Sequence, residues 1–136
     1  MKIDHIGYLC KNIQKSLEQF LCLGYQLKSE IVEDNLLLED GKVRNVSICF
    51  VEKDGYCLEL VSPLNQDSVV FQTLKKNGEG PYHVCYQTNN LEQSLINLTE
   101  QGYFVIQEPT TAIALENSKV AFLYMAGVGI IELVEC

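Results

Sequence analysis

The sequence contains no tryptophan, only three prolines and no apolar run of membrane-spanning length. A membrane-spanning helix needs about 20 consecutive apolar residues, so we expect none here. The first ten residues, MKIDHIGYLC, begin at once with a strand-like pattern and lack the shape of a secretory signal peptide. These absences predict a cytoplasmic protein that does not act at a membrane.

Positive charge is also scarce. Ten Lys and Arg residues stand against 18 Asp and Glu, which gives a formal net charge of −8. The only basic cluster is Lys75-Lys76, whereas proteins that bind nucleic acid or anionic lipid present larger basic patches. The composition therefore predicts no nucleic-acid partner and favours a small-molecule substrate. We expect Lys42, Arg44 and Lys119 to be solvated surface charges rather than substrate contacts.

Six cysteines are present, but none forms a CxxC pair. Without an export signal, reduced thiols buried in the core are favoured over disulfides. Five of the six lie in apolar or strand-like runs: Cys10, Cys22, Cys49, Cys57 and Cys85.

The 136 residues, a normal size for one domain, contain an internal repeat. At a constant offset of 78 positions, His5 matches His83, Asn12 matches Asn90 and Gly24 matches Gly102. Later in each copy, CLELV (57–61) matches IIELV (130–134), so that Glu59 matches Glu132. Two copies are too few for a solenoid and instead suit a pseudo-symmetric domain.

Each copy reads as a βαβββ module. Asn12 and Asn90 are good N-cap residues, and Gly24 and Gly102 stand where a helix end favours glycine. The sequence predicts an α+β fold in which modules 1–62 and 81–136 are joined by a linker, 63–80, with a short helix near 69–76. We expect the modules to be related by a pseudo-twofold axis and to form an open, curved, eight-stranded cup.

Four residues of the repeat form a candidate metal site. Because side chains alternate along a strand, Glu59 and Glu132 point away from their leucine neighbours, which we expect to face the helices. If the halves are related by a twofold axis, His5, Glu59, His83 and Glu132 can converge on it. Two neutral imidazoles and two carboxylates balance a divalent cation, and such ligands suit zinc, nickel, cobalt, manganese or iron.

A structural explanation exists for each residue taken alone. A single strand histidine is usually a hydrogen-bonded core or surface residue, and a glutamate in an ELV strand usually faces solvent. The metal site is favoured because the chain has only two histidines and both occupy the same position of the repeat.

The chain resembles the vicinal-oxygen-chelate superfamily, also called the glyoxalase/bleomycin-resistance/dioxygenase fold, and within it the methylmalonyl-CoA epimerase family. The similar stretches are IDHIGY (3–8), ELVSPLNQDS (59–68), LKKNGEGPYHV (74–84) and GIIELVE (129–135). The resemblance implies that His5, Glu59, His83 and Glu132 bind the metal. It also implies a metal-dependent isomerase or epimerase that abstracts a proton next to a carbonyl through a metal-stabilised enolate.

By the same resemblance, Glu132 is the first candidate for the catalytic base and Glu59 the second. The implied substrate is an acyl-CoA or another thioester, and the implied assembly is a homodimer. Two stretches differ. Where the epimerase family has an HPK-like run, this chain reads YMAG (124–127), and where some epimerases carry a second acid, NVSICF (45–50) has no carboxylate. Three alternatives stay open, namely an enzyme like lactoylglutathione lyase (glyoxalase I), a non-catalytic drug-binding protein of the superfamily, and an extradiol dioxygenase.

Overall fold

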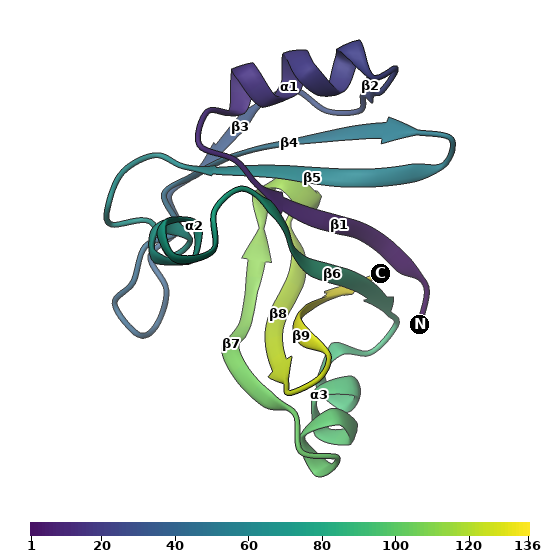
Figure 1. The fold of residues 1–136 in the computed structure, drawn as a ribbon. Coiled ribbons are helices and arrows are strands. Elements are labelled where there is room, and N and C mark those ends of the chain that lie inside the picture. The colour runs from purple at the N-terminus through teal and green to yellow at the C-terminus, as the bar shows by residue number, and fades with distance from the viewer. The chain divides into compact units, whose positions relative to one another are not determined.

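A computed structural model describes all residues from 1 to 136, which form nine β-strands, three α-helices and one short 3₁₀ helix (Figure 1). The chain divides into two compact units. The first unit is Ile6–Tyr82, and the second unit is Met1–His5 together with His83–Cys136.

The elements follow one another in this order: β1 (Ile3–Leu9), α1 (Ile13–Cys22), β2 (Gln26–Leu27), β3 (Val32–Asp34), β4 (Val46–Lys53), β5 (Tyr56–Pro63), α2 (Phe71–Asn77), β6 (Gly80–Thr88), α3 (Leu91–Glu100), β7 (Phe104–Ala112), η1 (Ile113–Leu115), β8 (Ser118–Met125) and β9 (Gly129–Glu135). No helix is long and apolar enough to span a membrane.

In the first unit the strands are hydrogen-bonded in the order β2-β4-β5-β1, and α1 packs on β4 and β5. β1 runs parallel to β5, whereas β4 and β5 form an antiparallel hairpin. Asp54 and Gly55 make the turn with φ values of 54° and 84°, as a two-residue type I′ turn requires. The short helix expected near 69–76 is confirmed as α2.

The sequence predicts eight strands, but the structure has nine because the second strand of the first repeat is broken. Leu27 of β2 pairs with Val51, and Val32 of β3 pairs with Ile48. The four residues 28–31 thus face only two residues on β4, which leaves no continuous register. At the break, the amide of Phe50 donates to the hydroxyl of Ser29 at 3.0 Å.

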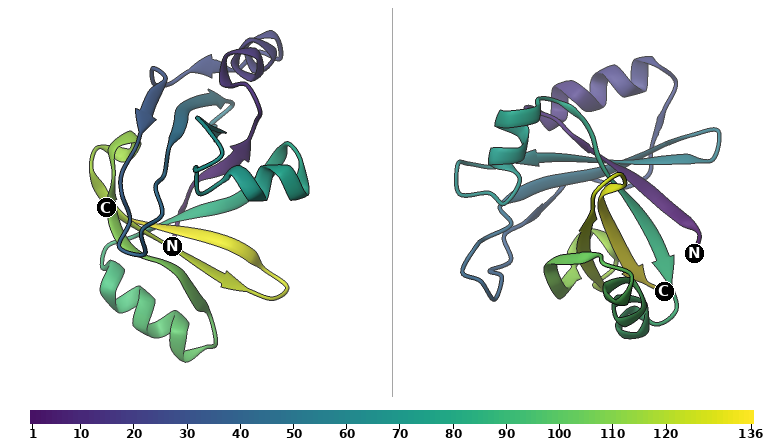
Figure 2. Two further views of the ribbon diagram at one scale, coloured as in Figure 1. Left: turned by 90° about the vertical axis from the view of Figure 1, so that its left-hand side faces the viewer. Right: turned by 60° about the horizontal axis from the view of Figure 1, so that its bottom comes forward.

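In the second unit the strand order is β1-β6-β9-β8-β7, and α3 contacts β7, β8 and β9 (Figures 1 and 2). β6 runs parallel to β9, and β8 is antiparallel to both of its neighbours. The start of β1 lies beside the end of β6, because the Gln87 amide donates to the Lys2 carbonyl at 2.8 Å. β6, α3 and β7–β9 reproduce the predicted βαβββ order.

Each unit buries an apolar cluster under its helix. Tyr8 and Phe20 pack on the cluster that contains the fully buried Leu60, and Tyr86 packs on the cluster that contains Leu133. The prediction that these tyrosines and leucines lie under the helices is confirmed. Strand alternation then sends Glu59 and Glu132, which precede the two leucines, to the opposite face of the sheet.

Two expectations about single residues need correction. All six cysteines are free thiols, as predicted, but Cys22 and Cys136 are exposed rather than buried. Arg44 is not a solvated surface charge. It is buried, and Nη1 donates to Oδ2 of Asp34 at 2.8 Å. A buried guanidinium is tolerable only with such a partner, which explains why this charge leaves the surface.

The α+β class is confirmed. The module bounds 1–62 and 81–136, the linker 63–80 and the twofold relation stay predictions.

The N-caps provide a test of the local structure. Oδ1 of Asn90 accepts the amide proton of Gln93 at 3.0 Å at the start of α3. We expect Asn90→Ala to lower the free energy of unfolding by about 1 kcal/mol, because an amide at the helix start loses its partner. Urea denaturation of the variant would measure this loss. The neighbouring exposed residue provides a matched control, Asn89→Ala, which we expect to change stability by less than about 0.5 kcal/mol.

Candidate metal centre

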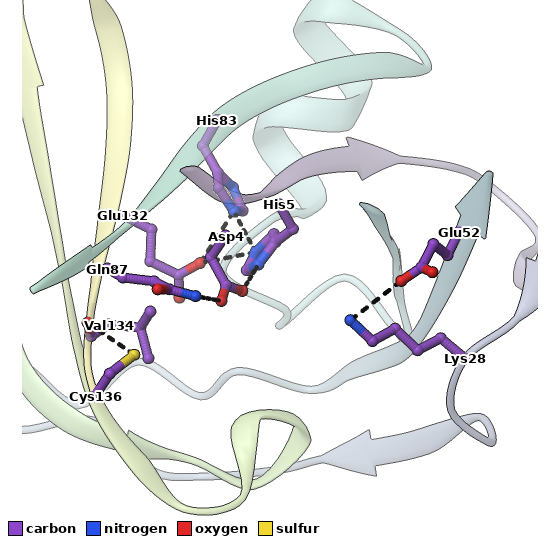
Figure 3. A network of polar contacts seen from close by, with 9 residues as sticks. All are labelled: Asp4, His5, Lys28, Glu52, His83, Gln87, Glu132, Val134 and Cys136. Atoms are coloured by element: carbon purple, nitrogen blue, oxygen red, sulfur yellow. Dashed lines mark hydrogen bonds and ion pairs between the residues drawn. The ribbon is translucent and has the colours of Figure 1, made fainter. Parts of the chain in front are cut away.

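Three of the four predicted ligands meet in the second unit (Figure 3). Nε2 of His5 lies 3.2 Å from Oε1 of Glu132, and Nε2 of His83 lies 3.1 Å from the same oxygen. The two Nε2 atoms are 3.5 Å apart. These three atoms therefore form a small triangle of groups that can each bind a metal ion.

Strand geometry accounts for this meeting. His5 lies on β1, His83 on β6 and Glu132 on β9. In the parallel pair of β6 and β9, Cys85 is the register partner of Glu132, so both share one face of the sheet. His83, two residues before Cys85, shares that face too. All three predicted ligands are buried, with relative exposures of 1%, 3% and 4% for His5, His83 and Glu132.

The size of the triangle fits a metal site. Ligands about 2.1 Å from a divalent ion are separated by about 3.0 Å in octahedral and about 3.4 Å in tetrahedral geometry. The observed separations of 3.1, 3.2 and 3.5 Å match this range. Oε1 of Glu132 has no partner in good hydrogen-bond geometry, although it is buried. The three groups thus fit ligands around a shared cation better than a set of mutual hydrogen bonds.

The electrostatics keep Glu132 ionised. Burial alone raises the pKa of this carboxyl, but the contacts with His5 and His83 outweigh burial and lower the pKa to about 2. Glu132 is therefore a carboxylate at neutral pH, the form in which it can bind a metal ion.

Two polar residues behind His5 were not predicted. Oδ2 of Asp4 lies 2.7 Å from Nδ1 of His5, on the side of the ring away from the triangle (Figure 3). Nε2 of Gln87 in turn donates to Oδ1 of Asp4 at 2.7 Å. Sequence alternation sends Asp4 to the face opposite His5, and Gln87 is distant along the chain, so no pattern indicated either contact.

An aromatic residue borders the triangle. Phe122 on β8 is the cross-strand partner of Glu132, and its ring meets the ring of His83 edge to face with centroids 5.3 Å apart. This contact limits water on one side of the ligands and restricts the rotation of His83.

The fourth predicted ligand, Glu59, belongs to the first unit. It lies on β5, has a relative exposure of 6%, and is the register partner of Gly7 on β1. Its role as a ligand and as second catalytic carboxylate stays a prediction, as does the role of Glu132 as base. Arg44 is buried and forms an ion pair with Asp34.

Curated relatives of this chain include methylmalonyl-CoA epimerases. The bovine mitochondrial epimerase is 27% identical over 129 residues, which cover 94% of this chain and 69% of the relative. A second relative, the uncharacterized protein YqjC of Bacillus subtilis, is 31% identical over 103 residues, which cover 74% of this chain and 66% of YqjC. This chain thus spans about two thirds of the length of these relatives.

Solved structures share the fold over nearly the whole chain. The hypothetical protein BH1468 of Bacillus halodurans has a TM-score of 0.82 and 28% identity, and the match covers 99% of this chain and 94% of that one. The methylmalonyl-CoA epimerase of Streptomyces coelicolor, in complex with 2-nitronate-propionyl-CoA, has a TM-score of 0.77 and 25% identity, with 99% and 96% covered.

The predicted resemblance is confirmed by these relatives and by a family model. The model of the Glyoxalase/Bleomycin resistance protein/Dioxygenase superfamily matches residues 4–122, and this chain therefore belongs to that superfamily.

Proposed function

We propose that this protein is a metal-dependent isomerase that moves a proton on the carbon next to the carbonyl of an acyl thioester, in the manner of a methylmalonyl-CoA epimerase. The observation that carries the proposal is the buried triangle formed by Nε2 of His5, Nε2 of His83 and Oε1 of Glu132, with sides of 3.1 to 3.5 Å. Its donor atoms suit a divalent zinc, nickel, cobalt, manganese or iron ion.

We propose Glu59 as the fourth ligand. It is buried and stands opposite Gly7 in the register of β1 and β5. Gly7 follows His5 by two positions on the same strand, so its neighbour on β5 belongs to the same face as His5. With two imidazoles and two carboxylates, the four ligands would cancel the charge of the ion.

The metal ion and the two glutamates would have separate roles in the reaction. A bound divalent ion would polarise the substrate carbonyl and stabilise the negative charge that develops when the proton leaves. Glu132 would accept the proton from one face of the carbon, and Glu59 would deliver a proton to the opposite face. A carboxylate with a pKa near 2 is a weak base. Glu132 must therefore loosen its contacts with the imidazoles before it can take the proton.

The thioester is supported by the relatives. Several are methylmalonyl-CoA epimerases, and one such structure is a complex with methylmalonyl-CoA and NH4+. The identities of about a quarter support a reaction class rather than one substrate. A homodimer and a cytoplasmic location stay predictions.

Metal binding is the first test. We expect a divalent ion at about 100 times its dissociation constant to raise the free energy of unfolding by about 2.7 kcal/mol, because it binds only the folded protein. Urea denaturation with and without chelator, together with elemental analysis, would measure the effect. In His83→Ala most of the effect should vanish. The control is Glu108→Gln, which changes an exposed carboxylate on β7. This variant should show the same stabilisation by the divalent ion as the wild type. A wild-type protein that binds none of the five metals would contradict the proposed site.

Proton transfer is the second test. We expect the metal-loaded protein to exchange deuterium from solvent into the carbon next to the carbonyl of methylmalonyl-CoA, as followed by mass spectrometry. Glu132→Gln should slow this exchange by at least about 100-fold, the typical contribution of a general base. Glu108→Gln, which removes a charge outside the site, should leave the rate of deuterium exchange unchanged. Full metal content and full exchange in Glu132→Gln would show that another group is the base.

The same assay separates the alternatives. Exchange only into a hemithioacetal of glutathione would replace the epimerase proposal with a glyoxalase I reaction. A metal-loaded protein that exchanges neither compound would favour a non-catalytic binding protein.

A further inference from the structure

Two successive hydrogen bonds within the second unit fix the Nδ1 side of the His5 ring (Figure 3). Nδ1 of His5 lies 2.7 Å from Oδ2 of Asp4, and Oδ1 of Asp4 lies 2.7 Å from Nε2 of Gln87. The His5 side chain is fully buried, and that of Asp4 has a relative exposure of 23%.

The direction of these hydrogen bonds follows from the chemistry of the groups. An ionised carboxylate only accepts, so the amide nitrogen of Gln87 must face Asp4, and Nδ1 of His5 must carry the proton. With the proton on Nδ1, the neutral ring has its lone pair on Nε2. That atom is the one that lies 3.2 Å from Glu132 and 3.5 Å from His83.

The backbone places Gln87 within reach of Asp4. The Gln87 amide donates to the carbonyl of Lys2, which joins the end of β6 to the start of β1. The pair of Asp4 and Gln87 is thus fixed by strand pairing, and rotation of the His5 ring would break a short, charge-assisted hydrogen bond.

A second reading of this corner is a metal site formed by Asp4, His5 and Cys85, whose donor atoms lie within 4.8 Å of one another. The distance between the two side chains opposes it. The 2.7 Å separation of His5 and Asp4 is a hydrogen-bond length, shorter than the roughly 3.0 Å between two ligands of one ion.

We propose that Asp4 and Gln87 are positioning residues for the metal site, which hold His5 with its proton on Nδ1 and its Nε2 lone pair directed at the ion. This inference rests on the proposed function, because it assumes that His5 is a ligand. Carboxylates that hold a ligating histidine in this way typically contribute about 10- to 100-fold to metal affinity. Asp4 also adds negative charge close to the bound cation.

The test uses Zn²⁺ and the full chain. We expect Asp4→Ala to weaken Zn²⁺ binding by about 10- to 100-fold in a chelator competition assay. Gln87→Ala should weaken binding less, because it leaves the contact between Asp4 and His5 in place. The exposed control, Glu108→Ala, removes a charge of the same sign outside the site and should bind Zn²⁺ as the wild type does.

A spectroscopic readout separates positioning from a general loss of stability. The chain has only two histidines, so the imidazole ¹H–¹⁵N signals of the Zn²⁺-loaded protein are simple to assign. The wild type should show a slowly exchanging, downfield Nδ1 proton for His5. Asp4→Ala should lose this signal or shift it upfield, while the signals of His83 stay in place.

A reciprocal exchange of groups tests the hydrogen-bond chain itself. In the double variant Asp4→Asn with Gln87→Glu, the amide at position 4 can accept from His5 and donate to the carboxylate at position 87. We expect this variant to keep the His5 Nδ1 proton signal and to bind Zn²⁺ more tightly than Asp4→Ala. Should Asp4→Ala fail to fold, the double variant and Gln87→Ala still provide the comparison with wild type.

The two proposals can fail separately. If the wild type binds Zn²⁺ but Asp4→Ala binds it equally well with an unchanged His5 signal, the positioning role is wrong and the metal site stands. If the wild type binds no divalent ion, the metal site is wrong and the positioning role with it.

Discussion

The second unit depends on a close contact between three buried polar groups, which the fold enforces. Two imidazole nitrogens and a carboxylate oxygen are held within 3.5 Å of one another at buried positions. Lone pairs that face each other repel, and a buried carboxylate costs several kcal/mol unless a positive charge compensates it. Protons on the imidazoles can supply that charge, and so can a metal ion. Strand pairing stabilises this arrangement. The backbones of β1, β6 and β9 are held by hydrogen bonds in which the three side chains take no part.

The meeting of His5, His83 and Glu132 could be predicted because the repeat and strand alternation act together. The repeat matches His5 with His83 and Glu59 with Glu132, which no single copy would reveal. Alternation then assigns a face to each residue, because leucines at positions 60 and 133 must lie under the helices. A one-residue shift in register would have moved every ligand to the helix side. The burial of Leu60 and Leu133 shows that the register is the expected one.

The contacts that sequence could not predict depend on side-chain reach rather than on periodicity. Asp4 turns toward the ring of its own neighbour, and Gln87 meets it across a strand pair, so neither follows alternation. Arg44 leaves the surface because Asp34 lies within reach of its guanidinium. At the break between β2 and β3, the hydroxyl of Ser29 accepts the amide proton of Phe50. In each case a single polar side chain overrides a local pattern.

The candidate ligands alone do not decide the substrate, because one fold can support several reactions. The second unit has aromatic side chains beside Glu132 on the same face of the sheet. Phe122 is the cross-strand partner of Glu132, Tyr124 lies two residues further along β8, and Phe104 is the cross-strand partner of Tyr124. Tyr124 begins the YMAG stretch, where the epimerase family has an HPK-like run. Only two basic residues, Lys2 and Lys119, belong to this unit, and eight of the ten belong to the first. Lys119 alternates to the face opposite Phe122. The face of the second unit that carries Glu132 is therefore poor in positive charge.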